Sequence, residues 1–189
     1  MHIVLFGGAF DPPHLGHISV VKNFLDLKLV DRLVFLPVFN HAFDKDMMGP
    51  QHRLKMLEEV KKTHFKDLPV YISEYEIHKE GMSITYETLE ELTKENPRHT
   101  YSFLIGSDNL ESFHKWHHFE EMLEKYKFFV YPRAGYSFDN LREGMIALKY
   151  MPEMKVSSSV IRENLENKKS VDDLLSSEII DYIKENELY

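Results

Sequence analysis

The chain of 189 residues contains no cysteine, is 43% hydrophobic and carries a formal charge of −8. Without cysteine it has no disulfide and no thiolate for metal binding or nucleophilic catalysis, and its acidity argues against a general nucleic-acid binder. No apolar stretch is long enough to span a membrane, and no signal-peptide layout is visible, so a cytoplasmic location is expected. The length suits one domain over residues 1–189 with a full hydrophobic core.

Apolar runs and helical patterns alternate along the chain. The expected strands are residues 2–5, 32–38, 70–77, 101–106 and 127–132, and the expected helices start near residue 15 and cover 51–62, 85–95 and 157–167. Residues 154–156 form a short strand-like piece, and residues 135–149 are expected to be irregular. This alternation predicts an α/β fold: a doubly wound, Rossmann-like parallel sheet with helices on both faces and a small C-terminal helical extension.

Between the first strand and the first helix lies the segment G-G-A-F-D-P-P-H-L-G-H, residues 7–17. The first N–H groups of a helix lack partners and the helix dipole is positive there, so this end of a helix attracts anions. Gly7 and Gly8 allow a phosphate to approach the backbone closely. His14 and His17 are three residues apart and can face the same point. The segment therefore predicts a phosphate site.

Two simpler interpretations of this segment compete with the phosphate site. His14 and His17 could form half of a metal site, although no carboxylate or cysteine stands at ligand spacing beside them. The glycine pair could also be a turn without any chemistry. The adjoining Phe-Asp-Pro-Pro sequence and the second histidine disfavour that interpretation.

The segment S-S-S-V-I-R, residues 157–162, begins the helix expected over residues 157–167. Hydroxyl side chains at a helix start are most often caps, and Arg162 alone would be an ordinary surface arginine. Together they offer hydroxyls, free N–H groups and a guanidinium to a single anion.

These two motifs resemble those of the nucleotidyltransferase superfamily whose mark is (H/T)-x-G-H and whose second motif is S-S/T-x-x-I-R. The resemblance implies transfer of a nucleoside monophosphate from ATP or CTP to a phosphate-bearing acceptor. Within the superfamily the chain is most similar to the bacterial nicotinate-nucleotide adenylyltransferases, nearly end to end. The segments that carry this similarity are residues 51–57, 83–89, 105–108, 115–116, 133–136 and 181–189.

The resemblance implies a reaction in which ATP and nicotinate mononucleotide give deamido-NAD and pyrophosphate, with Mg²⁺ on the ATP phosphates and no metal ligand from the protein. The implied catalytic residues are His14, His17 and Arg162. Residues implied to bind ATP are Gly7, Gly8, Ala9, Phe10, His14, His17, Gly106, Arg133, Ser157, Ser158, Ser159 and Arg162. Residues implied to bind the nicotinate nucleotide are Thr85, Tyr86, Asp108, Trp116 and Lys45. The expected partners are these small molecules, without nucleic acid or membrane, and assembly into a homo-oligomer is left open.

The sequence departs from the family pattern in two places. After the second strand the family has a P-x-x-x-P-H-K-type segment, whereas here His41 and Lys45 stand in uncertain register. The tyrosine that follows K-W in the family is His117, whose backbone could still bind a carboxylate.

Other functions remain open from the sequence. The same motifs serve adenylyltransferases for nicotinamide mononucleotide or phosphopantetheine. A nucleotide-binding regulator without turnover and a metal-dependent hydrolase are alternatives of a different class. The hydrolase would be built on His14, His17, His117 and His118.

Overall fold

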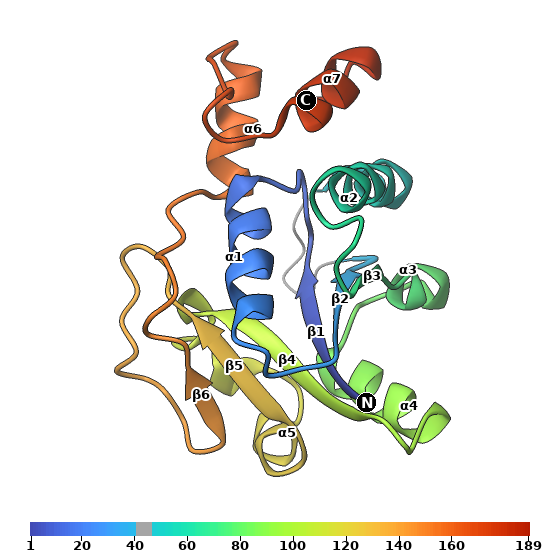
Figure 1. Ribbon diagram of the computed structural model, residues 1–189, viewed down its shortest axis with the longest axis vertical. Coiled ribbons are helices and arrows are strands. Elements are labelled where there is room, and N and C mark those ends of the chain that lie inside the picture. The colour runs from blue at the N-terminus through green and yellow to red at the C-terminus, as the bar shows by residue number, and fades with distance from the viewer. Residues whose placement is uncertain (41–46) are drawn as a thin grey trace.

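One parallel sheet organises the molecule. The computed structural model, which describes residues 1–40 and 47–189, arranges its strands in the order β3-β2-β1-β4-β5-β6, and every neighbouring pair is parallel (Figure 1). The strands are β1 (His2–Gly8), β2 (Arg32–Pro37), β3 (Val70–Ile72), β4 (Thr100–Gly106), β5 (Lys127–Tyr131) and β6 (Met145–Ala147). The order reverses between β1 and β4, and such a switch point is where open α/β sheets bind ligands.

Helices cover both faces of this sheet, as the alternation of apolar runs predicts. The helices are α1 (Leu15–Asp26), α2 (Pro50–His64), α3 (Tyr75–Lys79), α4 (Thr85–Glu95), α5 (Phe119–Lys125), α6 (Ser158–Glu166) and α7 (Ser177–Glu185), with short 3₁₀ turns η1 (Ser107–Asn109) and η2 (Phe113–Lys115). Val4 and Phe6 of β1 pack with α1, α2, α6 and α7, whereas Ile3 and Leu5 pack with η2, α4 and α5. The doubly wound, Rossmann-like fold expected from the sequence is therefore confirmed.

The last two helices form the expected C-terminal extension, and α7 packs against α2. Two hydrogen bonds join α7 to α2: Tyr182 Oη to His52 Nδ1 at 3.0 Å and His64 Nε2 to Glu178 Oε1 at 2.8 Å. In Figure 1, α6 and α7 lie together at one end of the molecule, beyond α1 and α2.

Three local expectations were wrong. The strand expected over residues 70–77 ends at Ile72, because Ser73 Oγ accepts a hydrogen bond from the backbone N–H of Tyr75 at 3.3 Å and starts a turn into α3. The segment 135–149, expected to be irregular, contains β6, which pairs with Phe128–Val130 of β5. Residues 154–156 form no strand, since only Met154 bridges to Arg133.

No helix among the described residues is long and apolar enough to cross a membrane.

Candidate active site

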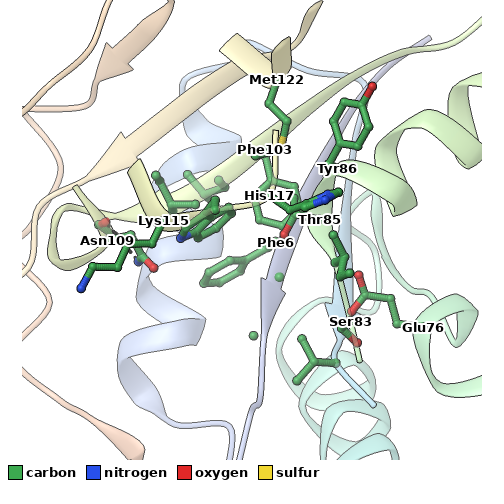
Figure 2. A pocket seen from close by; sticks show the side chains of 18 of the residues that line it. Phe6, Glu76, Ser83, Thr85, Tyr86, Phe103, Asn109, Lys115, His117 and Met122 are labelled. Carbon is green, nitrogen blue, oxygen red and sulfur yellow. Dashed lines mark hydrogen bonds between the residues drawn. The ribbon is translucent and has the colours of Figure 1, made fainter. Parts of the chain in front are cut away.

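A cavity of about 350 Å³ lies at the carboxyl ends of β1 and β4, beside the switch point. In Figure 2, Thr85 and Tyr86 stand on one side of it and Asn109 and Lys115 on the other, with Phe6 and His117 between them. The residues expected from the sequence that line it are Gly7, Gly8, Thr85, Tyr86, Gly106, Trp116 and His117. The fold thus brings segments from four regions of the chain to one cavity.

Gly7 lies at the end of β1, where space is restricted by an aromatic ring. A Cβ at this position would lie 2.5 Å from Cζ of Phe103, closer than side chains approach each other. Glycine at this position is therefore explained by packing against Phe103, which the sequence did not indicate. The expected approach of a phosphate to Gly7 and Gly8 stays a prediction.

His14 and His17 form a reciprocal cap at the start of α1. His14 Nδ1 accepts a hydrogen bond from the backbone N–H of His17 at 3.3 Å, and His17 Nδ1 accepts one from the backbone N–H of His14 at 3.2 Å. The two rings stack with their centroids 3.7 Å apart. Gly16 makes this possible, because a Cβ there would lie 2.9 Å from His14 Cε1 and 2.8 Å from Met154 Sδ.

Both histidines are held in the neutral form. Burial lowers the pKa of His14 to about 3, and the nearby Arg133 guanidinium adds to the effect. Burial, then the proximity of His14 and Arg133, holds the pKa of His17 well below its usual value. Because each Nδ1 is an acceptor, the proton of each neutral ring is assigned to Nε2. The pair therefore offers two N–H donors without a positive charge, and the Nδ1 atoms are not free for a metal.

Phe10 and Ala9 support the histidines from the preceding loop. The Phe10 ring is buried and meets the His17 ring edge-on, with centroids 5.0 Å apart, while its backbone has φ of 50°. The carbonyl of Ala9 accepts a hydrogen bond from Arg53 Nη1 at 2.9 Å. A contact of Phe10 with ATP would therefore have to come from its backbone.

Arg133 and Asp108 lie close together after β5 and β4. Arg133 Nε lies 3.5 Å from Asp108 Oδ2, and its charge acts on both His14 and His17. Asp108 is not among the residues that line the cavity beside Trp116. Asp108 thus lies beside Arg133, which is expected to bind ATP, and its contact with the nicotinate nucleotide stays a prediction.

The serines at the start of α6 join this helix to the loop before α1. Ser157 Oγ accepts from the backbone N–H of Val160 at 3.4 Å, so the capping interpretation holds for this hydroxyl. Ser158 Oγ donates to the carbonyl of Pro12 at 3.0 Å, whereas Ser159 is exposed. Contact of these serines with phosphates stays a prediction.

Arg162 also points to that loop. Its Nη1 donates to the carbonyl of Asp11 at 2.7 Å and lies 3.8 Å from Asp11 Oδ2. The contact brings the arginine of the second motif to the loop that carries the first motif, although 145 positions separate Arg162 from His17. The second motif is therefore next to the first in space.

The wall of the cavity combines a helix start with aromatic rings. No side chain among the described residues caps α4, whose first two residues are Thr85 and Tyr86, and both line the cavity. Such N–H groups suit an anion. Trp116 is partly buried, packs edge-on against Phe103 with ring centroids 6.3 Å apart, and lines the cavity. The cavity is therefore chemically suited to an aromatic ring that bears a carboxylate.

Two buried charged residues were missed by the sequence analysis. Glu76 of α3 lines the cavity, accepts from Thr88 Oγ1 at 2.8 Å, and has its pKa raised by burial. Arg53 is fully buried and donates to the carbonyls of Met48, Ala9, Val38 and Phe39 at 2.7–3.2 Å. It thereby fixes the loops after β1 and β2. The only sign of Arg53 in the sequence was its place in segment 51–57, which carries the family resemblance.

Lys45 and His41, named in the sequence analysis as ligand candidates, lie outside the described residues. Among the described residues, no three His, Cys, Asp or Glu side chains gather closely enough to hold a metal ion.

Comparison with known proteins finds relatives along nearly the whole chain. Residues 5–164 match the family model described as cytidylyltransferase-like. The chain is 34% identical to a probable nicotinate-nucleotide adenylyltransferase of Oceanobacillus iheyensis, over 99% of this chain and 96% of that one. It is 35% identical to the protein of the same description from Bacillus cytotoxicus, over 99% of this chain and 97% of the relative.

Solved structures share the fold. The structure of Plasmodium falciparum nicotinic acid mononucleotide adenylyltransferase complexed with NaAD superposes with a TM-score of 0.87 at 24% identity, covering 100% of this chain and 97% of that one. The same enzyme complexed with APC gives a TM-score of 0.86 at 22% identity, covering 100% of this chain and 96% of that one.

Proposed function

The chain belongs to the cytidylyltransferase-like family and, within it, to the nicotinate-nucleotide adenylyltransferases, and from this premise we propose that it transfers the adenylyl group of ATP to nicotinate mononucleotide. The products are deamido-NAD and pyrophosphate. The observation that carries the proposal is one cavity at the β1–β4 switch point. The uncapped start of α4 and Trp116 both line it, and the His14–His17 pair adjoins it through Phe6.

The chemistry is a displacement at phosphorus. An oxygen of the nicotinate mononucleotide phosphate forms a bond to the α-phosphorus of ATP, while the bond between that phosphorus and the bridging oxygen breaks and pyrophosphate leaves with the electron pair. The attacking phosphate is already largely ionised near neutral pH, so no strong base is needed. Catalysis then rests on positioning and on stabilising the charge that develops.

His14 and His17 supply the donors for that charge. Each ring presents a neutral Nε2–H that is fixed by the hydrogen bond at Nδ1. Donors held in place before the reaction stabilise a transition state without reorganisation. Arg162 and Arg133 add positive charge, which the uncharged histidines do not provide, and Arg162 is the residue we assign to the leaving pyrophosphate.

Mg²⁺ would accompany the ATP phosphates. The described residues hold no cluster of three carboxylate or imidazole ligands, which suits an ion bound mainly by phosphate oxygens and water. When bound there, Mg²⁺ would neutralise phosphate charge, and Arg133 and Arg162 would bind the triphosphate from the protein side.

The start of α4 accounts for the choice of acceptor. Among the described residues, the backbone N–H groups of Thr85 and Tyr86 have no hydrogen-bond partner. They match a carboxylate, which only accepts hydrogen bonds. A carboxamide would turn its own NH₂ donors toward some of these donors and leave buried groups unpaired. We therefore infer that nicotinate mononucleotide is the acceptor, with its pyridine ring against Trp116.

Product analysis tests the proposed reaction. The purified chain is incubated with ATP, Mg²⁺ and, in separate reactions, nicotinate mononucleotide or phosphopantetheine, and the products are identified by mass. We expect deamido-NAD and pyrophosphate in equal amounts from the first acceptor only. Turnover of phosphopantetheine alone would assign the chain to another branch of the family, and ATP binding without any pyrophosphate would make it a regulator.

A further inference from the structure

Asp11 is buried and accepts hydrogen bonds from three distant parts of the chain. It is 1% exposed and lies in the loop between β1 and His14. Its Oδ1 accepts a hydrogen bond from the hydroxyl of Tyr189, and its Oδ2 accepts one from the backbone N–H of Met48 at 3.1 Å. Its carbonyl accepts from Arg162 Nη1 at 2.7 Å.

The hydroxyl of Tyr189 remains protonated and donates a hydrogen bond to Asp11. Burial raises the pKa of the Tyr189 phenol, and its hydrogen bond to Asp11 and the proximity of that carboxylate raise it further. The phenol therefore keeps its proton near neutral pH. Tyr189 lies 178 positions from Asp11, and this contact joins the segment after α7 directly to the loop before α1.

From these contacts we propose that Tyr189 is a positioning residue for ATP: it fixes Asp11, and Asp11 in turn holds the guanidinium of Arg162 for the triphosphate. The proposal rests on the proposed function, since it assumes that Arg162 binds ATP. Tyr189 itself has no place in the cavity beside Trp116, so the acceptor should not sense its loss.

The contacts of Asp11 explain why loss of the Tyr189 hydroxyl should weaken ATP binding. A carboxylate that accepts from Tyr189 and Met48 is restrained at both oxygens, so the adjoining carbonyl that binds Arg162 is restrained as well. Without the phenol hydroxyl, one carboxylate oxygen loses its donor and Asp11 is free to turn toward Arg162, which already lies 3.8 Å from Oδ2. A closer pair between Asp11 and Arg162 would withdraw the guanidinium from the phosphates.

Tyr182 provides a matched control. It belongs to α7, and its hydroxyl also makes one hydrogen bond to a distant residue, His52 Nδ1 at 3.0 Å. Replacing either tyrosine by phenylalanine removes one hydroxyl and keeps the ring. Of these two tyrosines, Tyr189 is the one that contacts Asp11, so Tyr189→Phe should weaken ATP binding and Tyr182→Phe should not.

The experiment measures the Kd of α,β-methylene-ATP by calorimetry, the KM for nicotinate mononucleotide, and the Tm. For Tyr189→Phe we expect the Kd to rise by about three- to tenfold, the scale of one lost hydrogen bond. The KM for the mononucleotide should stay within about twofold, the spread expected when no bond to that substrate is lost. Tyr182→Phe should leave the Kd and the KM unchanged. It should lower the Tm by about as much as Tyr189→Phe does, because each variant loses one hydrogen bond.

A double-mutant cycle tests the route through Arg162. In an Arg162→Ala background, Tyr189→Phe should have no further effect on the Kd, because the group it positions is gone. An unchanged Kd for Tyr189→Phe alone, an effect that persists in the Arg162→Ala background, or equal changes for both substrates would each overturn the proposal. Turnover of nicotinate mononucleotide by the wild type and by Tyr182→Phe reports separately on the proposed function.

Discussion

His14 and His17 each accept a hydrogen bond at Nδ1 from the other's backbone N–H, at 3.3 and 3.2 Å, while their rings stack. The spacing of three residues at a helix start produces this reciprocal cap, and Gly16 leaves room for it. The arrangement fixes the ring orientation, the tautomer and the neutral charge together. The histidines of the first motif are therefore structural caps and hydrogen-bond donors at the same time.

The first prediction concerns the donor role of His17. We expect His17→Ala to lower kcat by about 10²-fold or more, the scale of losing one donor to a transition-state charge. His52→Ala is the control, because His52 lies on α2 and contacts Tyr182 instead of the cavity. Near-wild-type kcat in a folded His17→Ala protein would show that its Nε2–H plays no part in the chemistry.

The second prediction concerns stability and pH. The pKa of His14 is lowered to about 3 in the folded state, so the unfolded chain, where histidine has its ordinary pKa of about 6.5, takes up a proton first as the pH falls. The free energy of unfolding therefore decreases as the pH drops below about 6.5, and His14 alone accounts for about 1 kcal/mol of that decrease between pH 7.5 and 5.5.

The variant His14→Asn isolates this contribution. Asparagine is a good N-cap and does not titrate. Urea unfolding of both proteins at pH 7.5 and 5.5 should show a smaller decrease for the variant, by about 1 kcal/mol. Equal decreases in the two proteins would mean that His14 is protonated in the folded state.

The third prediction concerns Arg162. Arg162→Ala should raise the KM for ATP more than the KM for nicotinate mononucleotide, because the guanidinium is assigned to the leaving pyrophosphate. Arg162→Lys should rescue only in part, since an ammonium group lacks the planar, two-pronged geometry that holds both Asp11 and a phosphate. Steady-state kinetics with each substrate varied in turn measures this, and a matching rise in both KM values would contradict the assignment.

The fourth prediction concerns Trp116, which lines the cavity and packs edge-on against Phe103. Trp116→Ala should raise the KM for both nicotinate and nicotinamide mononucleotides by a similar factor, because stacking does not distinguish acid from amide. Trp116→Phe, which keeps a ring, should recover most of the loss. A change in the acid-to-amide ratio for Trp116→Ala would show that the indole takes part in reading the carboxylate.

Local sequence patterns predicted the regular elements well. The helix expected over residues 85–95 has those bounds, and both strands at the switch point were found, because buried strands and amphipathic helices leave local patterns. The strand expected over residues 70–77 failed because its apolar alternation continues into α3, where a turn at Ser73 redirects the chain. The three-residue strand β6 is too short to leave a pattern.

The supporting contacts of the site could not be predicted in the same way. The bond between Asp11 and Tyr189 joins residues 178 positions apart, and only the fold brings them together. Arg53 appears in the sequence as an ordinary charged helix residue, although it is fully buried against four carbonyl groups. The motif residues assigned to the substrates are visible in the sequence, whereas the contacts that hold them in place are visible only in the structure.

The most direct test of the account is the ratio of kcat/KM for nicotinate and nicotinamide mononucleotides, measured by pyrophosphate release with saturating ATP and Mg²⁺. The N–H groups at the start of α4, which have no partner in the part of the chain that the structure describes, match a carboxylate. Each buried group left unpaired by the amide costs about 1–3 kcal/mol. We therefore predict a preference for the acid of at least roughly tenfold. Equal kcat/KM values for the two mononucleotides would contradict the account and would identify a dual-specificity pocket.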